Sequence, residues 1–139
     1  MNNYQTKFQG YWLERNKAGI PAQQGLYLVY RSKYHVSSNT VDLLELLYIG
    51  KSENVQNRIA NHDKLDDFKK CLKSDEETIS YSFAPVNAEQ ELDILENALI
   101  FAQKPVLNDL LKDSFNYDPS SFDISGQCAL LKYTNFKIS

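Results

Sequence analysis

The pattern of apolar and polar positions predicts three strands in the first two thirds of the chain. Segments 25–32 (GLYLVYRS) and 43–50 (LLELLYIG) are rich in aromatic and aliphatic residues and are bounded by turn residues, as strands are. The polar, serine-rich segment between them predicts a hairpin with an extended loop. Segment 78–86 (TISYSFAPV) alternates well enough for a third strand.

A polar helix is predicted directly after the second strand. Ser52 is a good N-cap, and Val55 and Ile59 have the spacing of a buried stripe. Arg58 and His62 are four residues apart, so they would lie together on an adjoining face of this helix.

Two further helices are predicted. A short one covers 64–73 (KLDDFKKCLK), where apolar residues recur at helical spacing. The longest covers 88–103 (AEQELDILENALIFAQ), with Asn87 as its cap and Pro105 ending it from outside.

The order of these elements predicts an α+β fold, in which a small antiparallel sheet of about three central strands is flanked by helices. Weaker patterns over 7–13 (KFQGYWL) and 126–136 (GQCALLKYTNF) indicate extra edge strands from the termini. The length suits a single domain, residues 1–139. Residues 113–139 would form a C-terminal extension whose pattern assigns no clear structure.

The composition, with 42% apolar and 24% charged residues, is typical of a soluble globular protein. No apolar run reaches the length of a membrane span, and the start MNNYQTKFQG has no signal-peptide core. We therefore expect a cytoplasmic protein with no membrane partner. Cys71 and Cys128 lie far apart without a CxxC pattern, so we expect reduced, mostly buried thiols rather than a disulfide or a zinc site.

The net charge of −3 does not indicate a nucleic-acid-binding protein, but basic residues gather in one half of the chain. Residues 1–73 hold 11 Lys and Arg against 7 Asp and Glu, whereas residues 74–139 hold 4 against 11. A surface that faces phosphates would therefore lie in the first half. On charge alone, ordinary surface patchiness explains the asymmetry equally well.

The most specific signal lies in the first two predicted strands. Residues 25–27 (GLY) and 48–50 (YIG) resemble the paired tripeptides of the GIY-YIG nuclease family. Lys51 directly follows the second tripeptide, Arg58 lies ten residues after its tyrosine, and His62 lies one helical turn later. Several residue types at fixed spacing make the resemblance far more specific than either tripeptide alone.

The resemblance extends into the long helix. Glu96 lies inside that helix, and residues 104–108 (KPVLN) close it with the lysine-proline and asparagine ending common in the family. The match covers about residues 25–108 and implies the family's small antiparallel sheet flanked by helices. Twenty residues separate Tyr27 from Tyr48, about twice the family's usual gap, so we expect an enlarged hairpin loop.

The resemblance also implies phosphodiester cleavage. Such a reaction needs a base for the attacking water, neutralisation of the charge that develops on the phosphate, and stabilisation of the leaving oxygen. The family implies that Tyr27 takes the water's proton, with Tyr48 and Lys51 positioning or polarising it. Because a tyrosine pKa is about 10 in water, nearby cations would have to lower it, and Lys51, Arg58 and His62 would supply them.

Arg58 is the expected charge clamp, because a planar guanidinium holds two phosphate oxygens at once. The alternative is a solvated position in which Arg58 pairs with Asp63 or Asp66. His62 could share a proton with a tyrosine or contact the phosphate, although a lone helix histidine is more often a surface or helix-end residue.

Glu96 lies within an apolar stripe of its helix, where a carboxylate needs a partner. A divalent cation, a buried Arg or Lys, or a raised pKa would each meet that need. The resemblance selects the first of these. Glu96 would then hold one Mg²⁺ or Mn²⁺ ion, with waters and the substrate phosphate completing its coordination.

Four further residues are expected to contact the substrate, namely Gly50, Asn108, Lys69 and Lys70. Asn108 would orient a phosphate or a water through its amide, or would instead cap the chain after the proline. Lys69 and Lys70 would track a nucleic-acid backbone, or would form a solvated face with the neighbouring aspartates.

These interpretations lead to a metal-dependent endonuclease that hydrolyses DNA by in-line attack of water at a single site. The rival is a catalytically silent module of the same fold that binds nucleic acid or docks a partner. The acidic second half favours the rival, whereas the complete set of chemical positions opposes it. RNA stays open as a substrate because the phosphate chemistry is the same. Cutting both strands would call for a homodimer or a larger nuclease complex.

Overall fold

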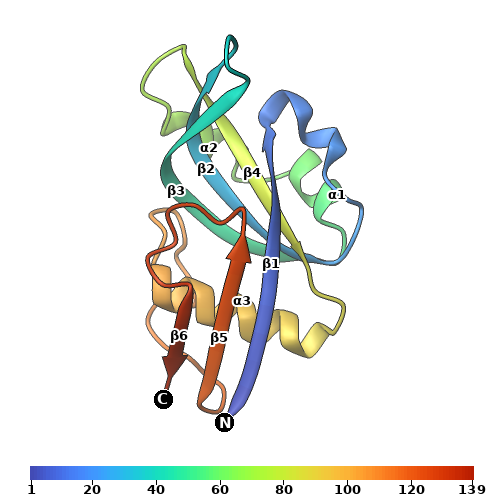
Figure 1. Cartoon of the computed structure of the whole chain (residues 1–139), viewed down its shortest axis with the longest axis vertical. Coiled ribbons are helices and arrows are strands. Elements are labelled where there is room, and N and C mark those ends of the chain that lie inside the picture. The colour runs from blue at the N-terminus through green and yellow to red at the C-terminus, as the bar shows by residue number, and fades with distance from the viewer.

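The computed structural model describes all 139 residues and is built around one six-stranded sheet (Figure 1). The strand order is β3-β2-β4-β1-β5-β6, in which β1 and β5 run parallel and the other neighbours run antiparallel. The predicted α+β class is therefore confirmed. The strands are β1 (Asn2–Leu13), β2 (Gly25–His35), β3 (Thr40–Ser52), β4 (Glu77–Pro85), β5 (Ser120–Gly126) and β6 (Asn135–Ile138).

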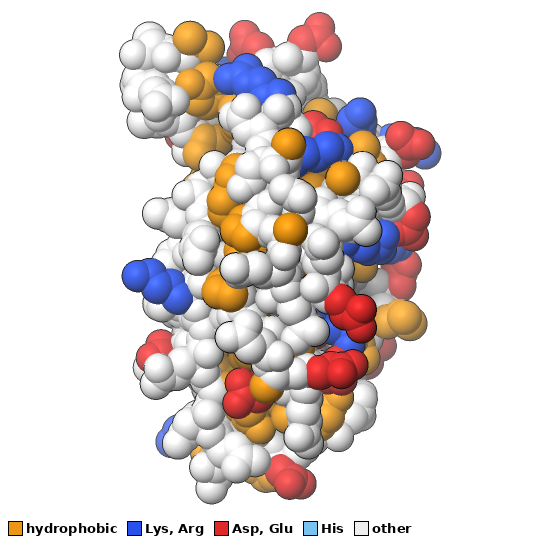
Figure 2. Space-filling view, turned by 90° about the vertical axis from the view of Figure 1, so that its right-hand side faces the viewer, with side chains coloured by type: hydrophobic (Ala, Val, Ile, Leu, Met, Phe, Trp, Pro, Cys, Tyr) orange, Lys and Arg blue, Asp and Glu red, His pale blue; other side chains and the backbone are white.

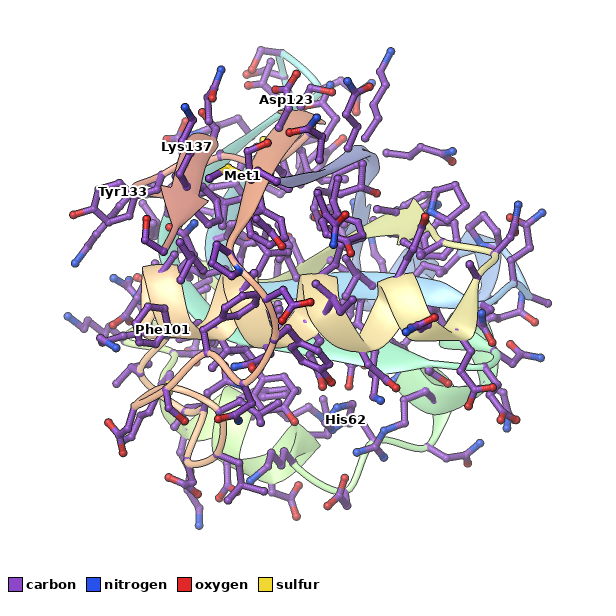
Figure 3. The ribbon with its side chains drawn as sticks, turned by 90° about the horizontal axis from the view of Figure 1, so that it is seen from below. Met1, His62, Phe101, Asp123, Tyr133 and Lys137 are labelled. Atoms are coloured by element: carbon purple, nitrogen blue, oxygen red, sulfur yellow. The ribbon has the colours of Figure 1, made fainter.

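Four helical segments pack on this curled sheet, namely the 3₁₀ helix η1 (Glu14–Gly19), α1 (Val55–Ala60), α2 (Leu65–Lys70) and α3 (Glu89–Gln103). Helix α3 lies inside the curl of the sheet, and the segment with α1 and α2 lies outside it (Figure 3). None of the four combines the length and the apolar character needed to cross a bilayer.

The alternation of side chains along β2 separates two apolar cores. Leu28 and Tyr30 join a core with α3, whereas Tyr27 and Val29 join a second core with α1 and α2. Neighbouring side chains of a strand point to opposite faces, so this part of β2 is buried on both sides. Strand β3 is one of the two edge strands, and its side chains also reach both cores. The edge of β3 therefore borders both helical layers.

The polar segment that was expected as a long loop is mostly strand. Strands β2 and β3 continue to His35 and from Thr40, so only residues 36–39 form the turn. The predicted enlarged loop is therefore wrong, and the insertion lengthens the hairpin instead. Arg31 ties the lengthened part together, because its guanidinium lies 3.2 Å from Glu45 and 3.0 Å from Glu77 on the two neighbouring strands.

Both predicted helix caps are wrong by one or two positions. Strand β3 stays paired as far as Ser52, so α1 begins later and Asn54 is its N-cap, with its side chain accepting a 3.0 Å hydrogen bond from the Asn57 N–H. Helix α3 has Ala88 as its N-cap and no side-chain cap. Asn87 instead accepts a hydrogen bond at its carbonyl from Gln24.

The terminal segments differ most from the sequence-based prediction. Strand β1 is not an edge strand, because it pairs with β4 on one side and β5 on the other. Residues 127–134 are turns and irregular backbone, so the strand predicted over 126–136 is wrong in its bounds. Strands β5 and β6 flank this irregular segment, and β6 forms the second edge of the sheet. Cys71 and Cys128 are unpaired but only partly buried.

Candidate active site

A cavity of about 240 Å³ opens where α3 meets the edge strand β3. Tyr48 of β3 and Glu96 of α3 both line it, so two predicted site residues from distant parts of the chain share one hollow. Lys64 and Asp109 also line it, and the sequence patterns had singled out neither. Lys64 and Asp109 lie between the helices and strands, where no sequence period predicts the direction of a side chain.

The Glu96 carboxylate is half-buried, and no hydrogen bond or ion pair within the chain engages it. Burial raises the pKa of Glu96, the charge of Lys51 lowers it, and Asp93 raises it further. A partly buried carboxylate without a partner is unfavourable in a purely structural position. Its negative charge is therefore available to a cation that enters the cavity.

Tyr27 and His62 form a buried pair beside the cavity. Only 1% of Tyr27 is exposed, and its Oη lies 2.8 Å from Nε2 of His62. The backbone N–H of Lys64 donates to Nδ1 of His62 at 3.1 Å. Burial lowers the pKa of His62 to about 4, so the ring is neutral near pH 7 and its one proton lies on Nε2. His62 therefore donates to the Tyr27 oxygen.

His62 does not lie on the surface face of a helix. Helix α1 ends at Ala60, and the turn that follows carries the His62 ring inward, on the side of α1 and α2 (Figure 3). The ring centroid lies 5.6 Å from that of Tyr48 and 5.0 Å from that of Phe68. The predicted association of His62 with a tyrosine agrees with this geometry, but its predicted place on the helix is wrong.

The packing of the Tyr27 ring requires glycine at position 50. It pairs with Tyr27 across the two strands, and a Cβ at position 50 would collide with Cζ and Oη of the Tyr27 ring. The absence of a side chain therefore lets the Tyr27 hydroxyl cross the backbone of β3 and reach His62. This explains Gly50 without any contact to a substrate.

The two tyrosines have different access to the cavity. Tyr48 is half-exposed and lines it, and its hydroxyl makes no hydrogen bond within the chain, whereas Tyr27 is enclosed. Burial raises the pKa of both hydroxyls and outweighs the lowering effect of Arg58. The expectation that nearby cations bring a tyrosine below its usual pKa is therefore wrong for this arrangement.

The predicted cations are held largely by acidic neighbours. Lys51 forms an ion pair with Asp93 of α3, and Nη2 of Arg58 donates to Asp63 at 2.6 Å. Lys64 has no such partner, and its Nζ lies 5.9 Å from the centre of the Tyr48 ring. On the face drawn in Figure 2, basic side chains are interspersed with acidic ones and no broad basic surface appears.

Of the remaining predicted contacts, Asn108 lines the cavity but its amide is bonded to the backbone, whereas Lys69 and Lys70 lie elsewhere. Asn108 is buried, and its amide accepts from the Ile49 N–H and donates to the Ile49 C=O, both at 2.9 Å. It therefore fixes the edge of β3 next to Tyr48 instead of presenting its amide to a phosphate. Lys69 and Lys70 lie on the exposed side of α2 and do not line the cavity.

The donor set of the cavity suits a hard divalent ion bound together with a substrate. No three His, Cys, Asp or Glu side chains cluster closely enough to hold a metal by themselves. Glu96 and Asp109 are the two carboxylates that line the hollow. Mg²⁺ typically uses one or two carboxylates and takes its remaining ligands from water and phosphate.

The α+β architecture is consistent with a GIY-YIG-like fold. The chain is 31% identical over 98 residues to UvrABC system protein C of Rickettsia bellii, a match that covers 70% of this chain and 14% of the relative. The protein of the same name from Chlamydia pneumoniae is 35% identical over 96 residues, or 68% of this chain and 14% of the relative. The one from Oenococcus oeni is 27% identical over 105 residues, or 76% and 16%.

The chain thus spans about one seventh of the length of these curated relatives. No family model matches the chain. No solved structure matches it either.

Proposed function

We propose that this chain is a GIY-YIG-type nuclease domain that hydrolyses DNA phosphodiester bonds at the cavity beside β3. One observation carries the proposal: the unpartnered, half-buried carboxylate of Glu96 shares its cavity with the free hydroxyl of Tyr48. A carboxylate in that setting suits a cation-binding role better than a structural one. Similarity to UvrABC system protein C supports a nuclease-type role in DNA repair.

Glu96 would hold one Mg²⁺ or Mn²⁺ ion, and Asp109 adds a second carboxylate to the same cavity. When bound, the ion would neutralise charge on the scissile phosphate and orient it. Because the protein offers so few ligands, we expect the ion to bind weakly until a substrate phosphate completes the site.

Tyr48, rather than Tyr27, is the better candidate to accept the proton of the attacking water. A general base must come within hydrogen-bonding reach of that water. Tyr48 lines the cavity with an unpartnered hydroxyl, whereas Tyr27 is enclosed and already bonded to His62. This assignment exchanges the roles that the family resemblance implied for the two tyrosines.

Tyr27 and His62 would act together to position the Tyr48 ring. Their hydrogen bond fixes the Tyr27 ring 6.2 Å from the Tyr48 ring, measured between centroids. Because His62 donates, the Tyr27 hydroxyl keeps its own proton free for donation. Arg58 would release Asp63, which is exposed, and span two phosphate oxygens with its guanidinium.

A plasmid-nicking assay tests the proposal. Supercoiled plasmid incubated with the protein and Mg²⁺ or Mn²⁺ should become nicked, and excess chelator should stop the reaction. Nicks rather than double-strand breaks are expected, because the chain carries one site. DNA and RNA oligonucleotides of the same sequence would then identify the substrate. Retardation of DNA with no cutting in either metal would contradict the proposal and favour the silent binding module.

The Arg58→Lys variant should lose about 10²-fold in kcat/KM, a loss typical for one charge-stabilising donor. Lysine keeps the positive charge but cannot span two phosphate oxygens. Arg15→Lys is the matched control, because Arg15 is an exposed arginine that packs over the ring of Tyr34 rather than beside Tyr27 and Asp63 as Arg58 does. Near-normal turnover of Arg58→Lys in single-turnover kinetics would mean that Arg58 is not the clamp.

The cleavage rate should rise with pH from 6 to 9 without a plateau. Burial raises the pKa of Tyr48, so the deprotonated form stays a minor species that grows about tenfold with each pH unit. His62 should add no inflection there, because its pKa is lowered to about 4. Single-turnover rates at constant metal and ionic strength measure the profile. An inflection near pH 6.5 would instead assign the titrating group to a histidine.

A further inference from the structure

The segment that follows α3 forms an apolar wall on the catalytic cavity. Leu110 and Leu111 of this segment line the hollow together with Tyr48 of β3 and with Glu96 and Ile100 of α3. Leu110 is 78% exposed, and Leu111 is also exposed. Leu110 therefore places an exposed apolar surface beside the polar groups of the cavity, in the region that a bound substrate would enter.

This wall is held in place by Asn97, the neighbour of Glu96 on α3. Asn97 is 2% exposed, and its side-chain NH₂ donates to the carbonyls of Leu111 at 3.2 Å and Ser114 at 2.8 Å. Its side-chain oxygen accepts from the N–H of Asn116 at 3.0 Å. One buried amide thus makes three hydrogen bonds to the loop, so the position of the wall is coupled to the helix that carries Glu96.

The other end of the loop is anchored to the edge strand. The Leu107 N–H donates to the Leu47 carbonyl at 3.0 Å, and the Asn108 amide pairs with the backbone of Ile49. Between the anchors, Leu111 has a φ of 67°, a left-handed conformation that residues other than Gly and Asn rarely adopt. The hydrogen bonds at both ends of the loop therefore hold Leu110 and Leu111 at the cavity, although Leu111 adopts an unfavourable backbone conformation.

We propose that Leu110 is the apolar contact for the nucleobase next to the scissile phosphate, with Leu111 and Asn97 positioning it; this rests on the proposed function. A phosphodiester substrate brings a base into the site on each side of the phosphate. The side chain of Leu110 carries neither charge nor hydrogen-bonding groups, so this part of the wall suits the apolar face of a base better than a charged phosphate. Every base has an apolar face, so this contact would fix the substrate without reading its sequence.

The test combines a protein variant with a modified substrate. Oligonucleotides with an abasic nucleotide at each position around the cleavage site are cut by the wild type and by Leu110→Ser. At one flanking position the wild type should lose about tenfold in kcat/KM, a loss typical for a small apolar contact. The Leu110→Ser variant should lose a similar factor on the normal substrate and show no further loss on that abasic substrate.

Val36→Ser is the matched control, because Val36 is equally exposed, at 78%, and lies in the hairpin turn away from the cavity. It should behave as the wild type on every substrate. Equal abasic penalties in the wild type and Leu110→Ser would overturn the inference. So would unchanged kinetics of Leu110→Ser alongside a changed sedimentation coefficient, which would assign the leucine to a protein interface. Absence of all cleavage by the wild type would overturn the proposed function itself, and this inference with it.

Discussion

The Glu96→Gln variant is expected to lose metal-dependent cleavage almost completely while folding as well as the wild type. A bound divalent ion contributes several kcal/mol to stabilising the transition-state charge, which corresponds to a rate loss on the order of 10³-fold. Glutamine keeps the size of the side chain but offers no negative charge to hold the ion. Single-turnover nicking at rising Mg²⁺ or Mn²⁺ concentration measures the loss.

Glu96→Gln should also be at least as stable as the wild type. The pKa of Glu96 is raised in the folded protein, so the folded state binds this proton more readily than the unfolded chain does. This group therefore lowers the free energy of unfolding as the pH rises above its unfolded-state pKa. Because Glu96 has no partner to lose, Glu96→Gln should unfold in urea at the same concentration as the wild type at pH 7, or at a higher one.

Glu91→Gln is the matched control, because Glu91 is exposed on the same helix and does not line the cavity. It should cut at the wild-type rate. Cleavage by Glu96→Gln within a few-fold of the wild type, at any metal concentration, would contradict the account. A large loss of stability in that variant would show instead that Glu96 is a structural residue.

The second large effect is expected from Tyr48→Phe, which should lower the rate of cleavage by about 10²–10⁴-fold, the usual contribution of general acid–base catalysis. Only the hydroxyl is removed, and that hydroxyl makes no hydrogen bond within the chain. Urea unfolding should therefore be unchanged. Substrate binding, measured by fluorescence anisotropy with chelator present, should also stay close to that of the wild type.

Tyr27→Phe should lower the stability more, and the rate of cleavage less, than Tyr48→Phe does. Removing this hydroxyl leaves the buried Nε2–H of His62 without an acceptor, which costs about 1–3 kcal/mol of stability. The rate of cleavage should fall less than in Tyr48→Phe, because Tyr27 would act only through its neighbours. A greater rate loss in Tyr27→Phe than in Tyr48→Phe would return the role of the base to Tyr27.

The central helices could be predicted from the period of their apolar positions, and the central strands from runs of aromatic and aliphatic residues bounded by turns. Val55 and Ile59 are buried as their spacing predicted, and the predicted strands around Tyr27 and Tyr48 do pair with each other. The terminal strands gave weaker patterns. Strand β5 has only Phe122 and Ile124 alternating with polar residues, too short a run to separate a strand from a loop.

The residue types of the candidate site could be predicted from spacing, but their surroundings could not. Burial of Tyr27 and His62 depends on a turn that carries His62 inward after Ala60, and no local pattern signals such a turn. The neutral state of His62 follows from its burial, and its donation to Tyr27 follows from the Lys64 N–H that occupies Nδ1. Contacts of this kind arise only once distant segments pack, so sequence periodicity does not reveal them.

A crystal structure with a DNA duplex and Mn²⁺, using Tyr48→Phe to slow cutting, would test the proposed ion site at Glu96 most directly. Anomalous scattering would locate the ion. One ion is expected about 2.1 Å from a Glu96 carboxylate oxygen, and it should also contact a phosphate oxygen of the bound strand next to residue 48. A duplex bound at another face, with the Glu96 carboxylate in contact with neither ion nor phosphate, would contradict the proposed ion site.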